Sequence, residues 1–186
     1  MARGGHLLAT GNPSTRVVVG LGNHERQYAR TRHNVGALVV DRAARRLGLR
    51  PTPGLNPIPV SRSGVVLPDG FMNDSGGLVR RAVQRWHPSA RGLLVVHDEL
   101  DLPLGEVQLK EGGGHGGHNG LRDVIAQLGT GDFLRLRVGI GRPPGRMDPA
   151  DYVLAPFRPE ERDTIAQALA RAEDEVIAFL ESGDRG

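Results

Sequence analysis

The stretch Gly112-Gly-Gly-His-Gly-Gly-His-Asn-Gly120 separates two segments of different periodicity and indicates how the chain is organised. Residues 105–110 before it form a β-like run, and residues 121–128 after it form a helix-like run. Six glycines in nine residues lose much conformational entropy on ordering and bury almost no apolar surface, so packing does not account for them. We expect the bare backbone N–H groups of this strand-to-helix passage to meet a polar or anionic ligand.

Working outward from this stretch, strand-like and helix-like segments alternate along most of the chain, with one place where two strands follow each other. This order predicts an α/β fold with a single globular domain over residues 16–186, built on a twisted mixed sheet flanked by helices. Residues 1–15 are polar and without periodicity, and they predict a flexible N-terminal tail. Strands are expected at 16–21, 63–68, 92–96, 105–110 and 133–141, and helices at 35–47, 78–86, 121–128 and 158–182; residues 50–61 are expected to be irregular because prolines punctuate them.

The composition allows a nucleic-acid partner and excludes disulfide-bonded and membrane-spanning proteins. The 186 residues carry a net charge of +3, and Lys110 is the only lysine among 24 basic residues. Arginine binds phosphate bidentately and stacks on bases, so a nucleic-acid partner is allowed. The absence of cysteine excludes disulfides and thiol nucleophiles. No apolar run approaches a membrane span, no secretory signal is recognisable, and no heptad pattern announces a protein partner, so we expect a cytoplasmic monomer.

Two other kinds of site have weak sequence support. The glycines at Gly20-Leu-Gly22 and those of the 112–120 stretch match parts of the dinucleotide-binding fingerprint, but Glu25 occupies the third glycine position and a glycine-rich run matches easily by chance. The spacing of His115 and His118 would suit a metal, but no third ligand lies nearby in the sequence. We therefore expect neither a nucleotide cofactor nor a metal.

Histidine, carboxylates and asparagines remain as the chemically active groups. His33 lies at the entrance of a predicted helix, which Thr31 or Asn34 would cap, and it shares seven residues with a tyrosine, two arginines and an asparagine. Acids follow the buried strand at 92–96, where one of them can orient a histidine base. Neutral amides can bind a carbonyl and stabilise an oxyanion. This set predicts water-mediated ester or amide hydrolysis, and the asparagines at strand-to-helix loops are Asn23, Asn73 and Asn119.

Several of these segments, taken in order, resemble the successive motifs of the bacterial peptidyl-tRNA hydrolase family. The resemblance covers about residues 16–180 and is carried by Gly20-Leu-Gly-Asn23, Tyr28-Ala-Arg-Thr-Arg-His-Asn34, Phe71-Met-Asn-Asp-Ser-Gly76, His97-Asp-Glu-Leu-Asp-Leu-Pro103 and the glycine stretch up to Leu121. Several long motifs together are far more specific than any one of them.

The resemblance implies cleavage of the ester between a peptide and the terminal ribose of tRNA, with tRNA as partner, no cofactor and no metal. It implies that His33 is the general base and Asp98 the acid that stabilises its working form. Basic groups facing tRNA would be Lys110, Arg137 and Arg146. The substrate-binding residues it implies are Asn23, Tyr28, Phe71, Met72, Asn73, His118 and Asn119.

The sequence departs from the family pattern at two loops. His24-Glu25 stands where the family usually has Pro-Gly, which removes a rigid turn, and Gly70 stands where it usually has threonine. The alternative function is a non-catalytic RNA-binding module on the same fold, since fold does not fix function. That alternative predicts that His33, Asp98 or the asparagines have been lost, and all of them are present.

Overall fold

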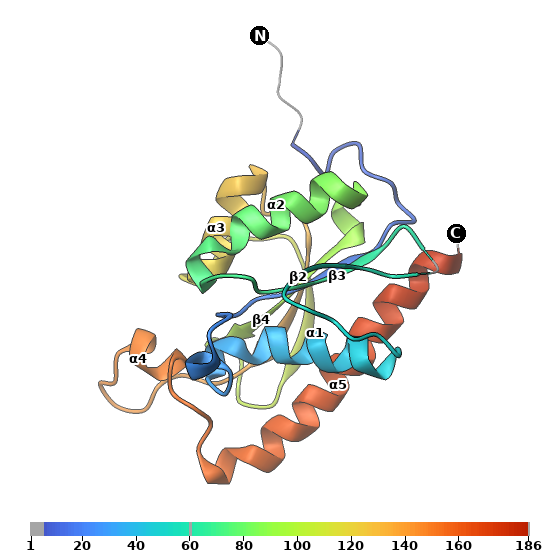
Figure 1. Ribbon diagram of the computed structural model, residues 1–186. Helices are drawn as coiled ribbons and strands as arrows, with labels where there is room; N and C mark the ends of the chain where they lie inside the picture. Colours follow the sequence, from blue (N-terminus) through green and yellow to red (C-terminus); the bar gives the residue numbers. More distant parts are fainter. Residues whose placement is uncertain (1–5, 60, 186) are drawn as a thin grey trace.

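A six-stranded sheet of order β2-β3-β1-β4-β6-β5 organises the computed structural model, which describes residues 6–59 and 61–185 (Figure 1). The four central strands run parallel, and each edge strand pairs antiparallel with its neighbour. The sheet is therefore mixed, as the sequence predicts. The strands are β1 Val17–Gly20, β2 Gly54–Pro57, β3 Gly64–Leu67, β4 Leu93–Glu99, β5 Val107–Glu111 and β6 Leu134–Gly139.

Helices cover both faces of the sheet (Figure 1). The helices α1 (Val35–Arg46) and α5 (Arg162–Glu181) pack on one face, and α2 (Ser75–Trp86) and α3 (Asn119–Leu128) pack on the other. Alternate residues of a strand point to opposite faces, so Val18 contributes to the first core and Val17 and Val19 to the second. The short helix α4 (Pro149–Val153) lies at the carboxyl end of the parallel strands.

Two elements of the structure have no counterpart among the elements predicted from the sequence. The edge strand β2 lies in the segment predicted to be irregular, because proline is tolerated at the edge of a sheet, where an N–H group is not needed for pairing. The helix α4 has five residues and starts at Pro149, so it is too short to show a helical period. The strand β4 also extends beyond the apolar run and includes His97 and Asp98.

The N-terminal segment, predicted as a flexible tail over residues 1–15, contacts the rest of the domain in its described part. Residues 1–5 lie outside the described residues. In the described part, Leu8 is buried in the core under α2, Thr15 is buried, and Asn12 forms a β-bridge with Pro88. Leu8 is a single buried apolar side chain in this segment, and one residue is too few to produce a periodic pattern in the sequence. Within the described residues, no helix has the length and apolar character needed to cross a membrane.

Candidate active site

Asp98 lies near the carboxyl end of β4 and forms the centre of the site. The strand is buried along nearly its whole length, which brings Asp98 to 3% exposure. The preceding residue, His97, is also buried, and its Nδ1–H donates to the carbonyl oxygen of Asp98 at 2.7 Å. Burial lowers the pKa of His97 to about 3, so this ring is neutral and does not compete for the Asp98 carboxylate as a cation.

His33 reaches Asp98 from the short helix η2 (Arg32–Asn34), which leads into α1. The first turn of α1 packs directly on the end of β4, because a Cβ at Gly36 would lie 2.1 Å from the carbonyl oxygen of Val96. This close approach brings His33 Nδ1 within 2.9 Å of Asp98 Oδ2. His33 itself is 8% exposed, in contrast to the surface position common for a histidine at a helix entrance.

His118 binds the other oxygen of the same carboxylate, with 2.8 Å between its Nε2 and Asp98 Oδ1. It is the N-cap of α3, and its Nδ1 accepts the backbone N–H of Leu121 at 3.3 Å. Because Nδ1 is the acceptor, the proton of the neutral ring lies on Nε2 and is donated to Asp98. The sequence predicts His118 as a substrate-binding residue, and the structure gives it a further contact with Asp98.

The shared carboxylate fixes the protonation of His33. Burial alone would raise the pKa of Asp98, but the charges and hydrogen bonds of His118 and His33 outweigh it and hold that pKa well below its usual range. An ionised Asp98 accepts the Nδ1–H of His33 and leaves the lone pair of His33 on Nε2. A histidine in this state can remove a proton from water.

The glycine loop between β5 and α3 delivers His118, and its backbone requires glycine. Four of its residues have φ between +57° and +120°, a range that side chains disfavour: Gly112, Gly113, Gly116 and Gly117.

Arg135 of β6 fixes the position of this loop by hydrogen bonds to its backbone. Its guanidinium donates to the carbonyl oxygens of Gly113 and Gly114, and to that of Gly131 at 3.0 Å. Arg135 is only 2% exposed. The strand periodicity predicts where Arg135 lies in β6. The sequence gives no signal for its contact with the loop, because the guanidinium binds backbone carbonyl oxygens and the glycines have no side chains that could indicate the partner.

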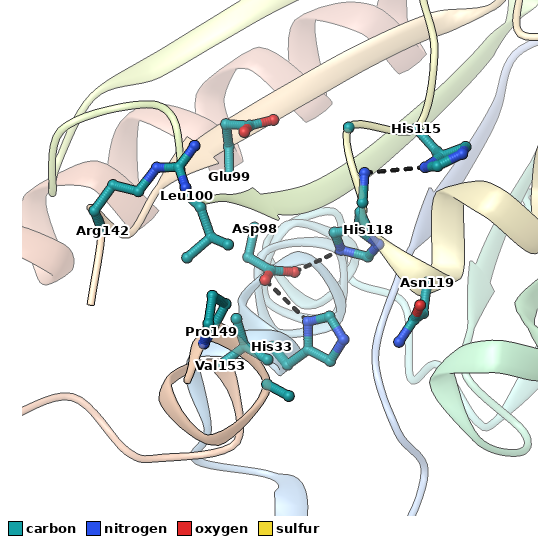
Figure 2. A pocket seen from close by; sticks show the side chains of 13 residues that line it. His33, Asp98, Glu99, Leu100, His115, His118, Asn119, Arg142, Pro149 and Val153 are labelled. Carbon is teal, nitrogen blue, oxygen red and sulfur yellow. Dashed lines mark hydrogen bonds and ion pairs between the residues drawn. The ribbon is translucent and has the colours of Figure 1, made fainter. Parts of the chain in front are cut away.

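A cavity of about 300 Å³ adjoins His33, Asp98 and His118 (Figure 2). Asn119 lies beside His33 on one side, and Arg142 and Leu100 lie on the other. The helix α4, which the sequence does not predict, forms part of the wall. No residue lining this cavity, in the part of the chain that the structure describes, carries a hydroxyl or thiol group.

The asparagines predicted for the site have different surroundings. Asn119 lines the cavity, and Asn73 is exposed on η3 (Met72–Asp74), which lies against α3. Asn23 is buried, and its Oδ1 accepts the backbone N–H of Met72 at 2.7 Å. Thr31 or Asn34 was predicted to cap α1. Asn34 occupies the N-cap position, but its side chain makes no cap bond; its amide bonds both the N–H and the carbonyl of Asn23, at 2.9 and 2.8 Å. The β1–α1 loop is thus fixed by side-chain amides.

The two departures from the family pattern meet in the structure. The backbone N–H of His24 donates to the carbonyl oxygen of Gly70 at 2.8 Å. A proline at position 24 would have no N–H to donate, so this bond depends on the departure. The loop after β1 is therefore tied to the loop after β3 by a hydrogen bond.

The remaining predicted substrate residues are not all brought to the cavity. Met72 is 4% exposed and packs in the core beneath Gly120, which accounts for its apolar character without a ligand. Phe71 is 48% exposed and Tyr28 is half-buried; within the described residues neither lines the cavity beside His33.

Two of the three predicted tRNA-contacting residues lie together. Lys110 and Arg137, on the paired strands β5 and β6, line one further cavity of about 320 Å³ with Arg135 and the glycine loop. Arg137 also pairs with Glu99 at 3.2 Å. Arg146 is exposed in the loop before α4 and does not line that cavity.

His33, Asp98 and His118 also lie close enough to hold a metal ion, with one ligand atom from each within 4.8 Å of the others. The sequence pairs His115 with His118 instead, but His115 Nδ1 accepts the N–H of Gly117 at 3.0 Å. Both nitrogens of His118 and both oxygens of Asp98 are engaged in hydrogen bonds, and a metal would have to replace these bonds. The donor set fits the hydrogen-bonded triad better than a metal site.

The fold and the site together define a hydrolase of mixed α/β fold that uses a histidine–carboxylate pair. The peptidyl-tRNA hydrolase family model matches residues 17–185, and the chain belongs to that family. It is 48% identical to a peptidyl-tRNA hydrolase of Rhodococcus erythropolis over 177 residues, which cover 91% of this chain and 93% of the relative. A peptidyl-tRNA hydrolase of Mycobacterium tuberculosis is 44% identical, with 90% and 92% covered.

Solved structures agree with this assignment. The crystal structure of a peptidyl-tRNA hydrolase from Acinetobacter baumannii superposes with a TM-score of 0.81 at 32% identity, covering 93% of this chain and 92% of that one. A peptidyl-tRNA hydrolase in complex with N-propanol gives 0.82 at 33% identity, covering 92% and 91%. The resemblance found in the sequence motifs is confirmed.

Proposed function

We propose that this enzyme hydrolyses the ester that links a peptide, or an N-blocked aminoacyl group, to tRNA, and so recycles tRNA from prematurely released peptidyl-tRNA. The observation that carries the catalytic assignment is the bond of 2.9 Å between His33 Nδ1 and the buried, ionised Asp98. It leaves His33 Nε2 as a base beside the cavity.

The reaction begins when a water molecule attacks the ester carbonyl carbon. His33 Nε2 takes one proton of that water, and the negative charge of Asp98 stabilises the imidazolium that forms. Such a base contributes about 10²–10⁴-fold to the rate. The C–O bond to the ribose then breaks, and His33 returns the proton to the ribose oxygen. The products are a free peptide acid and tRNA, so the cycle balances with water as the only co-substrate.

The amides beside His33 suit the developing oxyanion and the peptide carbonyls. Asn119 lines the same cavity as His33 and has amide N–H groups to donate. An oxyanion donor of this kind contributes about 10²–10³-fold. Asn23 and Asn73 are proposed to hold the peptide side of the ester, because both lie on loops at the same end of the sheet. Tyr28 and Phe71 are proposed to contact the substrate outside the cavity.

The tRNA body is proposed to lie over β5 and β6. Lys110 and Arg137 line one cavity beside the glycine loop, and Arg146 extends the positive charge toward α4. Phosphate contacts of this type position an RNA without reading its sequence. We further propose that the enzyme acts as a cytoplasmic monomer without an obligate protein partner.

The test is release of an N-acetylated amino acid from tRNA in buffer containing a chelator. Wild type is expected to cleave the ester, and His33→Ala is expected to lose at least about 10²-fold in kcat. The matched control is His115→Ala, because His115 lines the same cavity without bonding Asp98, and it should retain activity within about tenfold. Binding of the tRNA by wild type without cleavage would contradict the proposal and favour the RNA-binding alternative.

A further inference from the structure

The residue before the general base carries a buried charge that the mechanism above does not use. Arg32 lies in η2 and is only 2% exposed. Its guanidinium forms an ion pair of 2.9 Å with the buried Glu161 of η5 (Pro159–Glu161). Burial alone would raise the pKa of Glu161, but the backbone N–H of Arg158 and the charge of Arg32 outweigh it and hold that pKa below its usual range. Both partners of the pair are therefore charged.

The same guanidinium binds the C-terminal end of α4. Its Nη1 donates to the carbonyl oxygens of Tyr152 at 3.2 Å and Ala155 at 3.3 Å. The backbone N–H of Arg32 donates to the same oxygen of Ala155 at 3.1 Å. The guanidinium carbon also lies 4.0 Å from the centre of the Tyr152 ring, within the range of a cation–π interaction. The last carbonyl groups of a helix have no partner within the helix, and here Arg32 supplies one.

The helix α4 depends on such contacts for its position. A helix of five residues is too short to be stable by itself in water. Besides the contacts at its C-terminal end, the hydroxyl of Tyr152 donates to the carbonyl oxygen of Ile140 at 2.6 Å. On the same helix, Pro149 and Val153 line the cavity beside His33 (Figure 2). The contacts that fix α4 therefore also fix where this wall of the cavity lies.

We propose that Arg32 is a positioning residue for the hydrolysis, because it holds the α4 wall of the cavity in place beside His33. This inference rests on the proposed function. Arg32 and His33 are adjacent in η2, so one short turn carries both the base and the group that fixes the wall. Stability alone does not require the ion pair, since buried pairs can often be replaced by apolar side chains without loss of stability. An apolar side chain would leave the carbonyl oxygens of α4 without this donor.

The experiment separates a role in folding from a role in positioning. Arg32→Met leaves the carboxylate of Glu161 without its buried cation, which should lower the urea midpoint of unfolding. Arg32→Met combined with Glu161→Gln removes both charges and keeps an oxygen for the N–H of Arg158, so the midpoint should return toward that of wild type. In both variants kcat for N-acetyl-aminoacyl-tRNA, measured where the protein is fully folded, is expected to fall about 10–100-fold. KM should stay within about threefold, because both residues are buried and offer almost no surface to the substrate.

A milder variant and a matched control complete the design. Arg32→Lys keeps a charge beside Glu161 but lacks the planar fork and the flat face that lies over Tyr152, and it should lower kcat about three- to tenfold. The control is the ion pair between Arg42 of α1 and Glu173 of α5, which is 2.9 Å long and also includes a buried carboxylate. Neither of its residues lines the cavity. Arg42→Met combined with Glu173→Gln should keep kcat within about threefold of wild type.

A wild-type kcat in the double variant of Arg32 and Glu161, with a recovered urea midpoint, would overturn the positioning role, because the pair would then contribute to folding alone. So would a raised KM with an unchanged kcat. If the methionine variants do not fold, Arg32→Lys decides, and a wild-type kcat in that variant would likewise overturn the proposal. Failure of the proposed function itself looks different, because wild type would then not cleave N-acetyl-aminoacyl-tRNA.

Discussion

Replacing Asp98 by asparagine should inactivate the enzyme by changing the tautomer of His33. The carboxylate accepts two N–H groups, from His33 at 2.9 Å and from His118 at 2.8 Å, and an amide has only one oxygen to offer. His118 must keep its proton on Nε2, because its Nδ1 accepts the N–H of Leu121. The asparagine oxygen therefore accepts the Nε2–H of His118, and the amide NH₂ group faces His33.

The NH₂ group needs an acceptor, so His33 is driven to accept at Nδ1 and to carry its proton on Nε2. His33 Nε2 then carries a proton and can no longer accept one from water. The corresponding change in the serine-protease triad costs about 10⁴-fold, and here we expect a loss of about 10³–10⁴-fold in kcat, or roughly 4–5.5 kcal/mol of transition-state stabilisation. KM should change little, because Asp98 is 3% exposed and offers almost no surface to a ligand.

Single-turnover cleavage of N-acetyl-aminoacyl-tRNA measures this loss. The control is Glu99→Gln, which alters the next residue of β4 but touches Arg137 and not the histidines. That variant should stay within about tenfold of wild type. If Asp98→Asn kept more than a tenth of the wild-type kcat, the assignment of Asp98 as the residue that fixes His33 would be wrong.

Three further predictions concern the support of the site, the tRNA side and the core. Arg135→Met should lower kcat about 10–100-fold with little change in tRNA affinity, because it releases the glycine loop and displaces His118; an unaltered kcat would separate the loop from catalysis. Lys110→Gln and Arg137→Gln should each reduce the slope of log Kd against log salt by about one, measured by titration with uncharged tRNA, and an unchanged slope would place the RNA elsewhere. Burial lowers the pKa of His97 to about 3 from 6.5, so the unfolded chain binds the extra proton between these values. The contribution of His97 to the free energy of unfolding should therefore be complete above about pH 6.5. Toward pH 3, the free energy of unfolding should fall by up to about 1.4 kcal/mol per pH unit. His97→Gln should remove that slope in urea titrations, and an identical slope in both proteins would show that His97 is not the group responsible.

The parallel strands and long helices could be predicted from the sequence because their residues repeat with a clear period. Val17–Gly20 is buried on both faces and reads as a continuous apolar run. The helix α5 buries a stripe from Ile165 to Leu180 at helical spacing. Elements with too few residues for a period, such as α4, gave no such signal.

Helix capping could not be predicted in detail because tertiary contacts replaced local ones. Asp74 occupies the N-cap position of α2 but its side chain makes no cap bond, and the N–H of Gly76 donates instead to Asp123 of α3 at 2.7 Å. In the same way, the side chain of Asn34 hydrogen-bonds the backbone of Asn23 instead of the backbone of its own helix. A side chain far along the chain can satisfy the orphan N–H groups of a helix, and local sequence does not reveal it.

The candidate site was predicted in its parts, and the structure joins them. His33 and one of the acids after 92–96 were expected to pair, and the structure places Asp98 between His33 and His118. The sharing of one carboxylate by two histidines has no sequence signature, because it depends on the close packing of Gly36 and on the path of the glycine loop. Residue type can indicate the chemistry, but only packing determines which atoms meet.

Chemical rescue of His33→Ala by imidazole tests the role of His33 as the base most directly. Removing the ring leaves a space beside the cavity of about 300 Å³, next to the intact Asp98 and Asn119. The variant alone should not cleave N-acetyl-aminoacyl-tRNA at a measurable rate, and added imidazole should restore cleavage in proportion to its unprotonated form. Cleavage by His33→Ala at a rate within tenfold of wild type, with no response to imidazole, would show that another group activates the water.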